Sequence, residues 1–463
     1  MAATQTEDYV PLKLVVNKES NKVIFAEAGK DFVDVLFSFL TFPLGTIARL
    51  VQKESNMEPV TIGCMSKLYQ SVADLDKECM TKETIKEMLL QPSYSLEDYC
   101  SSLKLNIDDT QPTKYYICRD IHYCYSPYVL STAKICGGCG IHLDPALIMD
   151  RQFCYGFVKD GATFVITDDL RVMPNSTDIT SFNMLQSLGI QNTSSLKDMT
   201  VNVTKEKVLD LLKCSFISKS ALTDSFLVMK PSIERSPTIV SCGIKGTDNR
   251  QISMKLVIRK SDGKIQYAEV GEYFVTFLLS FLTFPLGGVA RLFKGNCSIG
   301  SIDALYGSIL DLDEYKYFVT EEAKNRIVDP HLAPQFELGK HILPIRQSRS
   351  MFYLHDDDYI SCDIKAYFDE ITDIKPVCLT KFVQGYVKGP RTYIVTDDLV
   401  VTESSPTSVL HLINQSQTSL NDLKDKVINI GVNEGLSILK ASLTSTSALT
   451  SAFGYLVTEA QER

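Results

Sequence analysis

The chain contains the stretch LKLVVNKESNKVIFAEAGKDFVDVLFSFLTFPLGTIARL at residues 12–50. It returns at residues 254–292 as MKLVIRKSDGKIQYAEVGEYFVTFLLSFLTFPLGGVARL, at a constant offset of 242 residues and with the run SFLTFPLG unchanged. Dense agreement at a fixed interval is typical of an internal duplication. The sequence therefore predicts two homologous copies of one structural unit.

Shorter motifs repeat later in the chain at smaller offsets. The TDDL of residues 167–170 returns at residues 396–399, and the SALT of residues 220–223 returns at residues 447–450. The offset falls to 229 and then to 227 residues, so the second copy has lost residues. Most of this loss lies where the first copy carries a cluster of cysteines.

These repeats predict a domain at residues 1–229 and a second domain at residues 251–463. Residues 230–250 contain prolines, glycines and serines without a sustained apolar period, which is typical of a linker. Each copy is within the size range of a single domain.

Local patterns predict the elements of each copy. Residues 12–16 and 23–28 alternate as two β-strands joined by a polar turn, which indicates a hairpin. From Phe32 onward the apolar residues follow helical spacing, and Pro43 and Gly45 break the helix into two pieces.

The end of the first copy predicts further mixed structure. Residues 163–166 and 170–173 read as strands around Thr167-Asp168-Asp169, and Thr396-Asp397-Asp398 stands at the same place in the second copy. We expect these aspartates to form a hydrogen-bonded turn rather than a catalytic carboxylate pair. A strand at residues 199–203 precedes a helix with Thr204 as N-cap. Strands and helices do not alternate regularly, so the fold class is α+β with two tandem domains, each with β-hairpins and packed helices.

Four cysteines in the first copy form the best candidate site. They are Cys118, Cys124, Cys136 and Cys139. Four thiolates can close a tetrahedral shell around zinc, and glycines beside the C-x-x-C pair let the backbone fold tightly around it. The spacing of the first pair is wide, so His122 or His142 could replace one cysteine. Packed thiols without metal and a redox pair are the alternatives.

A closed site of this kind has a structural role, because it leaves no open position for water. We therefore expect a zinc knuckle that stabilises a loop-rich insertion. The second copy keeps only Cys362 and Cys378 in the matching region and is expected to fold without the metal.

Taken together, the AEAG hairpin, FLTFPLG, CGGCG and ITDDL resemble the plant domain-of-unknown-function family 674 over nearly the whole chain. The resemblance implies a plant protein with tandem copies, and it implies no activity. Where family members carry a C-P-x-C-like pair, this chain has Cys136-Gly137-Gly138-Cys139.

Charge and motifs restrict the function classes. With 47 basic and 56 acidic residues among 463, the formal net charge is -9, which gives nucleic acid no general electrostatic attraction. The chain has no Walker lysine loop, dinucleotide-binding glycine motif or nucleophile elbow. The sequence favours a non-enzymatic interaction or scaffold module with protein partners. The alternative is an enzyme or small-ligand binder with a site between the two copies.

The apolar stretches raise the question of a membrane. Residues 273–290 carry no charge, but the matching uncharged stretch in the first copy covers only residues 35–48 and is broken by Pro43 and Gly45. We expect both to be buried in the core rather than transmembrane, with peripheral membrane contact as the alternative. The first ten residues do not resemble a signal peptide, so we expect a cytoplasmic or nuclear protein.

Overall fold

The protein is described here from a computed structural model of residues 8–228 and 251–454. Within these limits the description omits residues 112–113, 120–123, 125–128, 132–133, 137–138, 146, 149–155, 176–182, 184, 187, 191–192, 339–340, 348–351, 356–358, 362–373 and 380–384. The expected linker at residues 230–250 lies outside the described residues.

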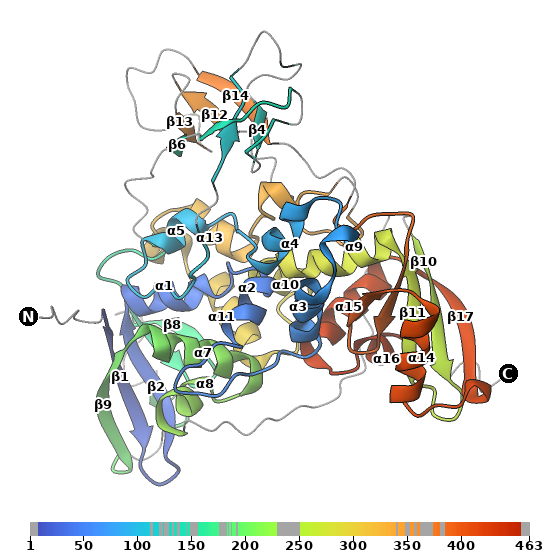
Figure 1. The fold of residues 1–463 in the computed structure, drawn as a ribbon. Helices are drawn as coiled ribbons and strands as arrows, with labels where there is room; N and C mark the ends of the chain where they lie inside the picture. Colours follow the sequence, from blue (N-terminus) through green and yellow to red (C-terminus); the bar gives the residue numbers. More distant parts are fainter. Residues whose placement is uncertain are drawn as a thin grey trace, which may run out of the picture.

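Two five-stranded antiparallel sheets of the same topology form the sides of the molecule (Figure 1). The first has the order β8-β7-β2-β1-β9, with β1 (Val10–Asn17), β2 (Lys22–Gly29), β7 (Thr163–Thr167), β8 (Val172–Pro174) and β9 (Leu196–Val203). The second has the order β16-β15-β11-β10-β17, with β10 (Ile252–Arg259), β11 (Ile265–Gly271), β15 (Thr392–Thr396), β16 (Val401–Glu403) and β17 (Leu423–Ile430).

The internal repeat is preserved in the register of the strands. Lys13 pairs with Glu27 in the first hairpin, and Lys255 pairs with Glu269 in the second. Even the irregularity recurs, because the register shifts between Val15 and Val16 and again between residues 257 and 258. Positions 242 residues apart are therefore structurally equivalent in these strands.

Most of the helices fill the space between the two sheets (Figure 1), whereas the helix at Pro406–Gln415 packs on the opposite face of the second sheet. Those of the first repeat are α1 (Lys30–Ser38), α2 (Leu44–Leu50), α3 (Met65–Asp74), α4 (Glu83–Leu90), α5 (Glu97–Ser101), α7 (Lys205–Ile217) and α8 (Ala221–Thr223). Those of the second are α9 (Glu272–Ser280), α10 (Leu286–Leu292), α11 (Gly300–Asp311), α12 (Glu314–Tyr317), α13 (Glu321–Val328), α14 (Pro406–Gln415), α15 (Val432–Thr444) and α16 (Ala448–Phe453). The α+β class, the opening hairpins and the break between α1 and α2 agree with the sequence analysis. Thr204 caps α7 as expected, because its side chain accepts a hydrogen bond from the backbone of Lys207.

The FLTFPLG segments lie at the centre of the molecule, where the two copies contact each other. Pro43 forms a β-bridge with Pro285. The aromatic and aliphatic side chains of both segments are buried, including Phe39 and Phe281 with no exposed surface. The expectation that these segments are buried is confirmed. Among the described residues, no helix is both long and apolar enough to cross a bilayer.

Each repeat places a helix on the sheet of the other repeat. Helix α11 packs against β8 and α7, and α3 packs against β16 and α9. The contacts are equivalent, because the edge-strand amide of Val172 donates to Ser308 Oγ at 2.8 Å and that of Val401 donates to Ser71 Oγ at 3.0 Å. One continuous buried apolar cluster includes residues of both repeats. The two repeats thus share a core.

A third, seven-stranded sheet stands above this body (Figure 1). Its order is β5-β3-β4-β14-β12-β13-β6, with β3 (Tyr116–Ile117), β4 (Val129–Ser131), β5 (Asp144–Pro145), β6 (Leu147–Ile148), β12 (Phe352–His355), β13 (Tyr359–Ser361) and β14 (Ile374–Leu379). Strands of the first repeat flank those of the second on both sides, through parallel pairing of β4 with β14 and of β6 with β13. We call this sheet with its connecting loops the upper module.

Candidate metal centre

A tight turn brings two of the four cysteines together in the upper module. Lys134 and Leu143 begin and end a short hairpin, because the amide of Leu143 donates to the carbonyl of Lys134 at 2.8 Å. Inside it, the amide of Cys136 donates to Ile141 O at 2.9 Å, and the amide of Gly140 donates to Cys136 O at 2.9 Å. Gly140 has φ of 75°, a left-handed conformation that glycine adopts without strain. This geometry directs the C-x-x-C pair to one side of the turn.

The other two cysteines complete a compact cluster of sulfurs. Cys118 directly follows β3, and its Sγ lies 3.7 Å from that of Cys139. The Sγ atoms of Cys124 and Cys136 are 3.6 Å apart. All four sulfurs lie within 4.8 Å of one another. The structure therefore brings together the whole set of cysteines that the sequence nominated.

The separations fit a shared metal ion better than a disulfide. Two sulfurs bound at about 2.3 Å to one tetrahedral zinc are separated by about 3.8 Å. A disulfide bond would require about 2.05 Å between them. The distances of 3.6 Å and 3.7 Å thus match two edges of a tetrahedral four-sulfur shell. The four cysteines lie close enough to hold a metal ion, and their chemistry is compatible with zinc.

The histidine alternatives are less well placed or are not described. His142 is exposed and forms a bridge with Ile135 on the hairpin, and it is not part of the cluster of candidate ligands. His122 lies outside the described residues, as does Cys362 of the second repeat. Cys378 lies in β14, where it pairs with Val129 of β4.

Burial and a backbone hydrogen bond shift the pKa of the Cys139 thiol in opposite directions. Cys118, Cys124 and Cys136 are buried, and Cys139 is half-buried. A backbone hydrogen bond from Ile141 lowers the pKa of the Cys139 thiol, but burial and the hydrogen bond from Cys136 raise it, and the pKa lies above its ordinary value. Because zinc binds thiolates, occupation of this site must release protons.

The cysteines make up most of a small buried cluster in the upper module. Among the described residues, this cluster consists of three cysteines and Leu143, with Tyr116 and Cys139 packed against it. Such a small apolar cluster contributes little stability by burial alone. A metal ion would supply the missing cross-links between β3 and the hairpin.

Comparison with known proteins agrees with the repeat and motif pattern. A family model described as "Protein of unknown function (DUF674)" matches residues 6–433. The chain belongs to this family. No curated protein and no solved structure matches the chain. Membership in DUF674 therefore brings no activity to the site, and the function must be argued from the geometry.

The paired aspartates of this DUF674 chain form the expected turns. Asp168 accepts hydrogen bonds from Thr223 N at 2.7 Å and from Thr223 Oγ1 at 2.8 Å. Asp397 accepts the same pair from Thr450 at 2.7 Å and 2.9 Å. The TDDL and SALT motifs, which recur separately in the sequence, are thus parts of one tie between a β-turn and a helix.

A buried charge pair in the first repeat was missed by the sequence analysis. Asp34 is buried, and its carboxylate receives Lys30 Nζ at 2.8 Å and the amides of Phe157 and Val158 at 2.8 Å and 2.9 Å. A Cβ at Gly156 would lie 2.1 Å from Asp34 Oδ2. Burial raises the pKa of Asp34 to about 6 despite the Lys30 charge. The second repeat has Thr276 at the position equivalent to Asp34. This difference between the two copies was the sequence signal that could have identified the buried charge pair.

Proposed function

We propose that the chain is a non-enzymatic interaction or scaffold protein whose upper module is held together by a structural zinc ion on Cys118, Cys124, Cys136 and Cys139. The observation that carries the zinc assignment is the four-sulfur cluster with separations of 3.6 Å and 3.7 Å. Four protein ligands fill a tetrahedral shell and leave no position for a substrate or a catalytic water. The metal would therefore act on folding.

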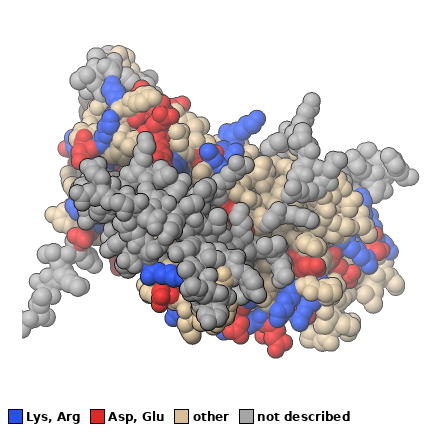
Figure 2. Space-filling model, turned by 90° about the horizontal axis from the view of Figure 1, so that it is seen from above, with Lys and Arg blue, Asp and Glu red and all other residues tan. Residues whose placement is uncertain are grey.

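The position of the metal supports an interaction role. The upper module stands apart from the body (Figure 1), and Ile135 and Ile141 on its hairpin are 54% and 43% exposed. Apolar side chains held on a rigid hairpin are suited to contact another protein. When the molecule is seen from above, basic and acidic side chains are interspersed on the surface of the described residues (Figure 2). This mixture favours protein over nucleic acid as the partner.

Elemental analysis of protein purified without added metal tests the zinc assignment. We expect one zinc ion per chain in the wild type and none in the Cys136→Ser, Cys139→Ser double variant. Ile135→Ser is the matched control, because it changes the same hairpin and keeps all four sulfurs. A wild type without zinc, or a double variant that retains it, would contradict the assignment.

The interaction role needs a second experiment. Affinity capture with the intact chain should recover a partner that is lost with Ile135→Ser, Ile141→Ser, while this variant keeps its zinc. Turnover in a broad substrate screen, with no partner recovered above background, would contradict the role.

A further inference from the structure

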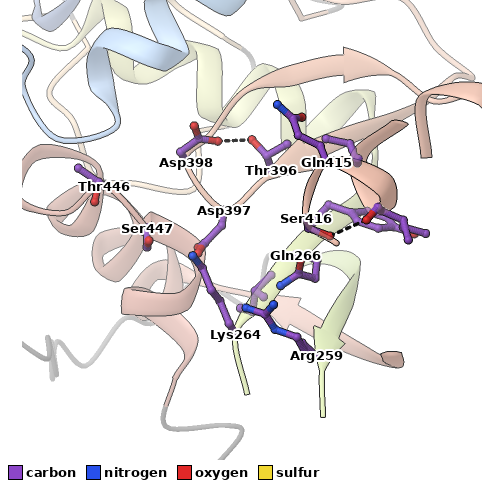
Figure 3. Close-up of a pocket in the computed structure, with 14 residues that line it drawn as sticks. Arg259, Lys264, Gln266, Thr396, Asp397, Asp398, Gln415, Ser416, Thr446 and Ser447 are labelled. Atoms are coloured by element: carbon purple, nitrogen blue, oxygen red, sulfur yellow. Dashed lines mark hydrogen bonds between the residues drawn. The ribbon is translucent and has the colours of Figure 1, made fainter. Parts of the chain in front are cut away.

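A cavity of about 470 Å³ lies in the second repeat, far in sequence from the cysteines. Its walls come from the ends of β10 and β11, the turn after β15, the end of α14 and the residues just before α16 (Figure 3). All of the lining residues belong to the second repeat, so this cavity is not the site between the copies that the sequence analysis considered. Cavities of this size are typical of small-molecule sites.

Two cations stand together on one wall of the cavity. Arg259 ends β10 and Lys264 directly precedes β11, and both line the cavity (Figure 3). The Arg259 guanidinium also pairs with Asp262 at 2.8 Å, which fixes its position at the rim. This wall favours an anionic group on a ligand.

Beside the apolar side chains of Leu412 and Ile413, the cavity is lined by groups that can bind hydroxyls. They are Gln266, Asp398, Gln415 and Ser416. Thr418 Oγ1 donates to Gln266 Oε1 at 3.5 Å and so orients the amide of Gln266. Asp398 is half-buried and receives a hydrogen bond from Thr396 through one carboxylate oxygen. Carboxylates, amides and hydroxyls arranged around a small space can pair with several hydroxyl groups at once.

The first repeat keeps Lys22 and Asp169 at the positions equivalent to Lys264 and Asp398, but it differs at two other positions of the lining. At the positions equivalent to Arg259 and Gln266 it has Asn17 and Ile24. Ile24 packs in an apolar cluster around Phe25 and Val165. The second repeat keeps the same sheet and register but replaces the isoleucine with an amide and adds a cation. Gln266 is half-buried, so its amide can hydrogen-bond to a ligand in the cavity, which the isoleucine of the first repeat cannot do.

We propose that this cavity binds a small polyhydroxylated anion, either a sugar phosphate or a sugar acid. Arg259 and Lys264 take the anionic group, and Gln266, Asp398 and Ser416 take the hydroxyls. We assign Asp397 a structural role, because both of its carboxylate oxygens accept hydrogen bonds from Thr450. This proposal does not rest on the zinc site or on the interaction role.

Calorimetric titration of the full-length protein tests it with four probes: glucose 6-phosphate, gluconate, glucose and inorganic phosphate. We expect saturable binding of at least one of the first two. Lys264→Gln and Gln266→Ile should each weaken this binding by about tenfold or more. Lys22→Gln is the matched control, because Lys22 is exposed at the equivalent position of the first repeat and should bind as the wild type does.

Three results would overturn the proposal. The first is no saturation by glucose 6-phosphate or gluconate at about 10 mM, a concentration that detects even weak binding. The second is unchanged binding in both second-repeat variants, after thermal unfolding has shown that they fold. The third is equal affinity for inorganic phosphate, which would leave no role for the groups assigned to the hydroxyls.

Discussion

The backbone N–H of Leu44 donates to the carbonyl of Phe284 at 2.9 Å, and the N–H of Leu286 donates to the carbonyl of Phe42 at 3.0 Å. The two bonds are the same interaction made in both directions, so the chain pairs with its own duplicate at the FLTFPLG segments. The most similar parts of the two repeats are therefore also the parts that join them.

This pairing predicts that the repeats stay together without a covalent link. A protease site introduced within residues 229–250 should allow complete cleavage while both fragments elute as one species on gel filtration. The shared apolar core and the exchanged helices α3 and α11 hold them. Urea should be needed to separate the fragments. Fragments that separate in native buffer would show that each repeat has a sufficient core.

The close contact at the centre predicts different effects for two neighbouring glycines. A Cβ at Gly287 would lie 2.4 Å from the carbonyl oxygen of Ile327 and 3.0 Å from that of Leu40. At Gly288 the nearest atom is a proline side-chain carbon at 3.5 Å. Gly287→Ala should lower the free energy of unfolding by about 2 kcal/mol or more, since backbone must move.

Gly288→Ala is the control and should change the free energy of unfolding by less than about 1 kcal/mol, because alanine also favours the helix. Urea denaturation of the two variants measures the difference. Equal effects would contradict the close packing of Gly287 against the backbone of Ile327 and Leu40.

Buried Asp34 predicts a pH dependence of stability. The pKa of Asp34 rises from its ordinary value of 3.8 to about 6 in the folded protein. Above pH 6 the buried carboxylate is ionised and lowers the free energy of unfolding, and protonation at lower pH removes this cost. As the pH falls from 7 to 4, the wild type should gain up to about 3 kcal/mol of unfolding free energy relative to Asp34→Asn. The comparison cancels the other titrating groups.

Asp31→Asn is the matched control for this titration, because it removes an exposed carboxylate from the same helix. Urea denaturation at several pH values provides the measurement, and a flat difference for Asp34→Asn would contradict the raised pKa.

The mixed order of the upper sheet predicts which amides depend on the metal. Chelation should expose the amides of β3, β12 and β14 to hydrogen exchange, although β12 and β14 belong to the second repeat. These strands lie beside those of the first repeat in one sheet. Protection of β1 and β10 should remain, because they are held by the main core. Uniform loss along the chain, or no loss, would contradict a metal that stabilises only this module.

Local elements were predictable because their signals are local. The hairpin of β1 and β2, the break at Pro43 and the cap at Thr204 each follow from a few neighbouring residues. The cysteine cluster was predictable because thiols at close spacing limit the chemistry. Contacts between residues far apart leave no such pattern. The Ser308 contact with β8 and the mixing of strands in the upper module therefore required the structure.

The differences between the repeats were visible in the sequence, but their meaning depended on position. Asp34 faces the amides of Phe157 and Val158, and its counterpart Thr276 faces that of Tyr386. Gln266 and Ile24 likewise occupy one position on two sheets. Knowing which positions are equivalent converts an ordinary substitution into evidence about a site.

Helices α3 and α11 each pack on the sheet of the other repeat, and this arrangement has a consequence for how the molecule can evolve. A pair made of two identical chains must accept every substitution twice, once on each side of its axis. Fusion in a single polypeptide removes this restriction and fixes the ratio of the two sides. One side can then carry four cysteines while the other carries a cavity lined by Arg259 and Gln266, and neither change has to be made twice.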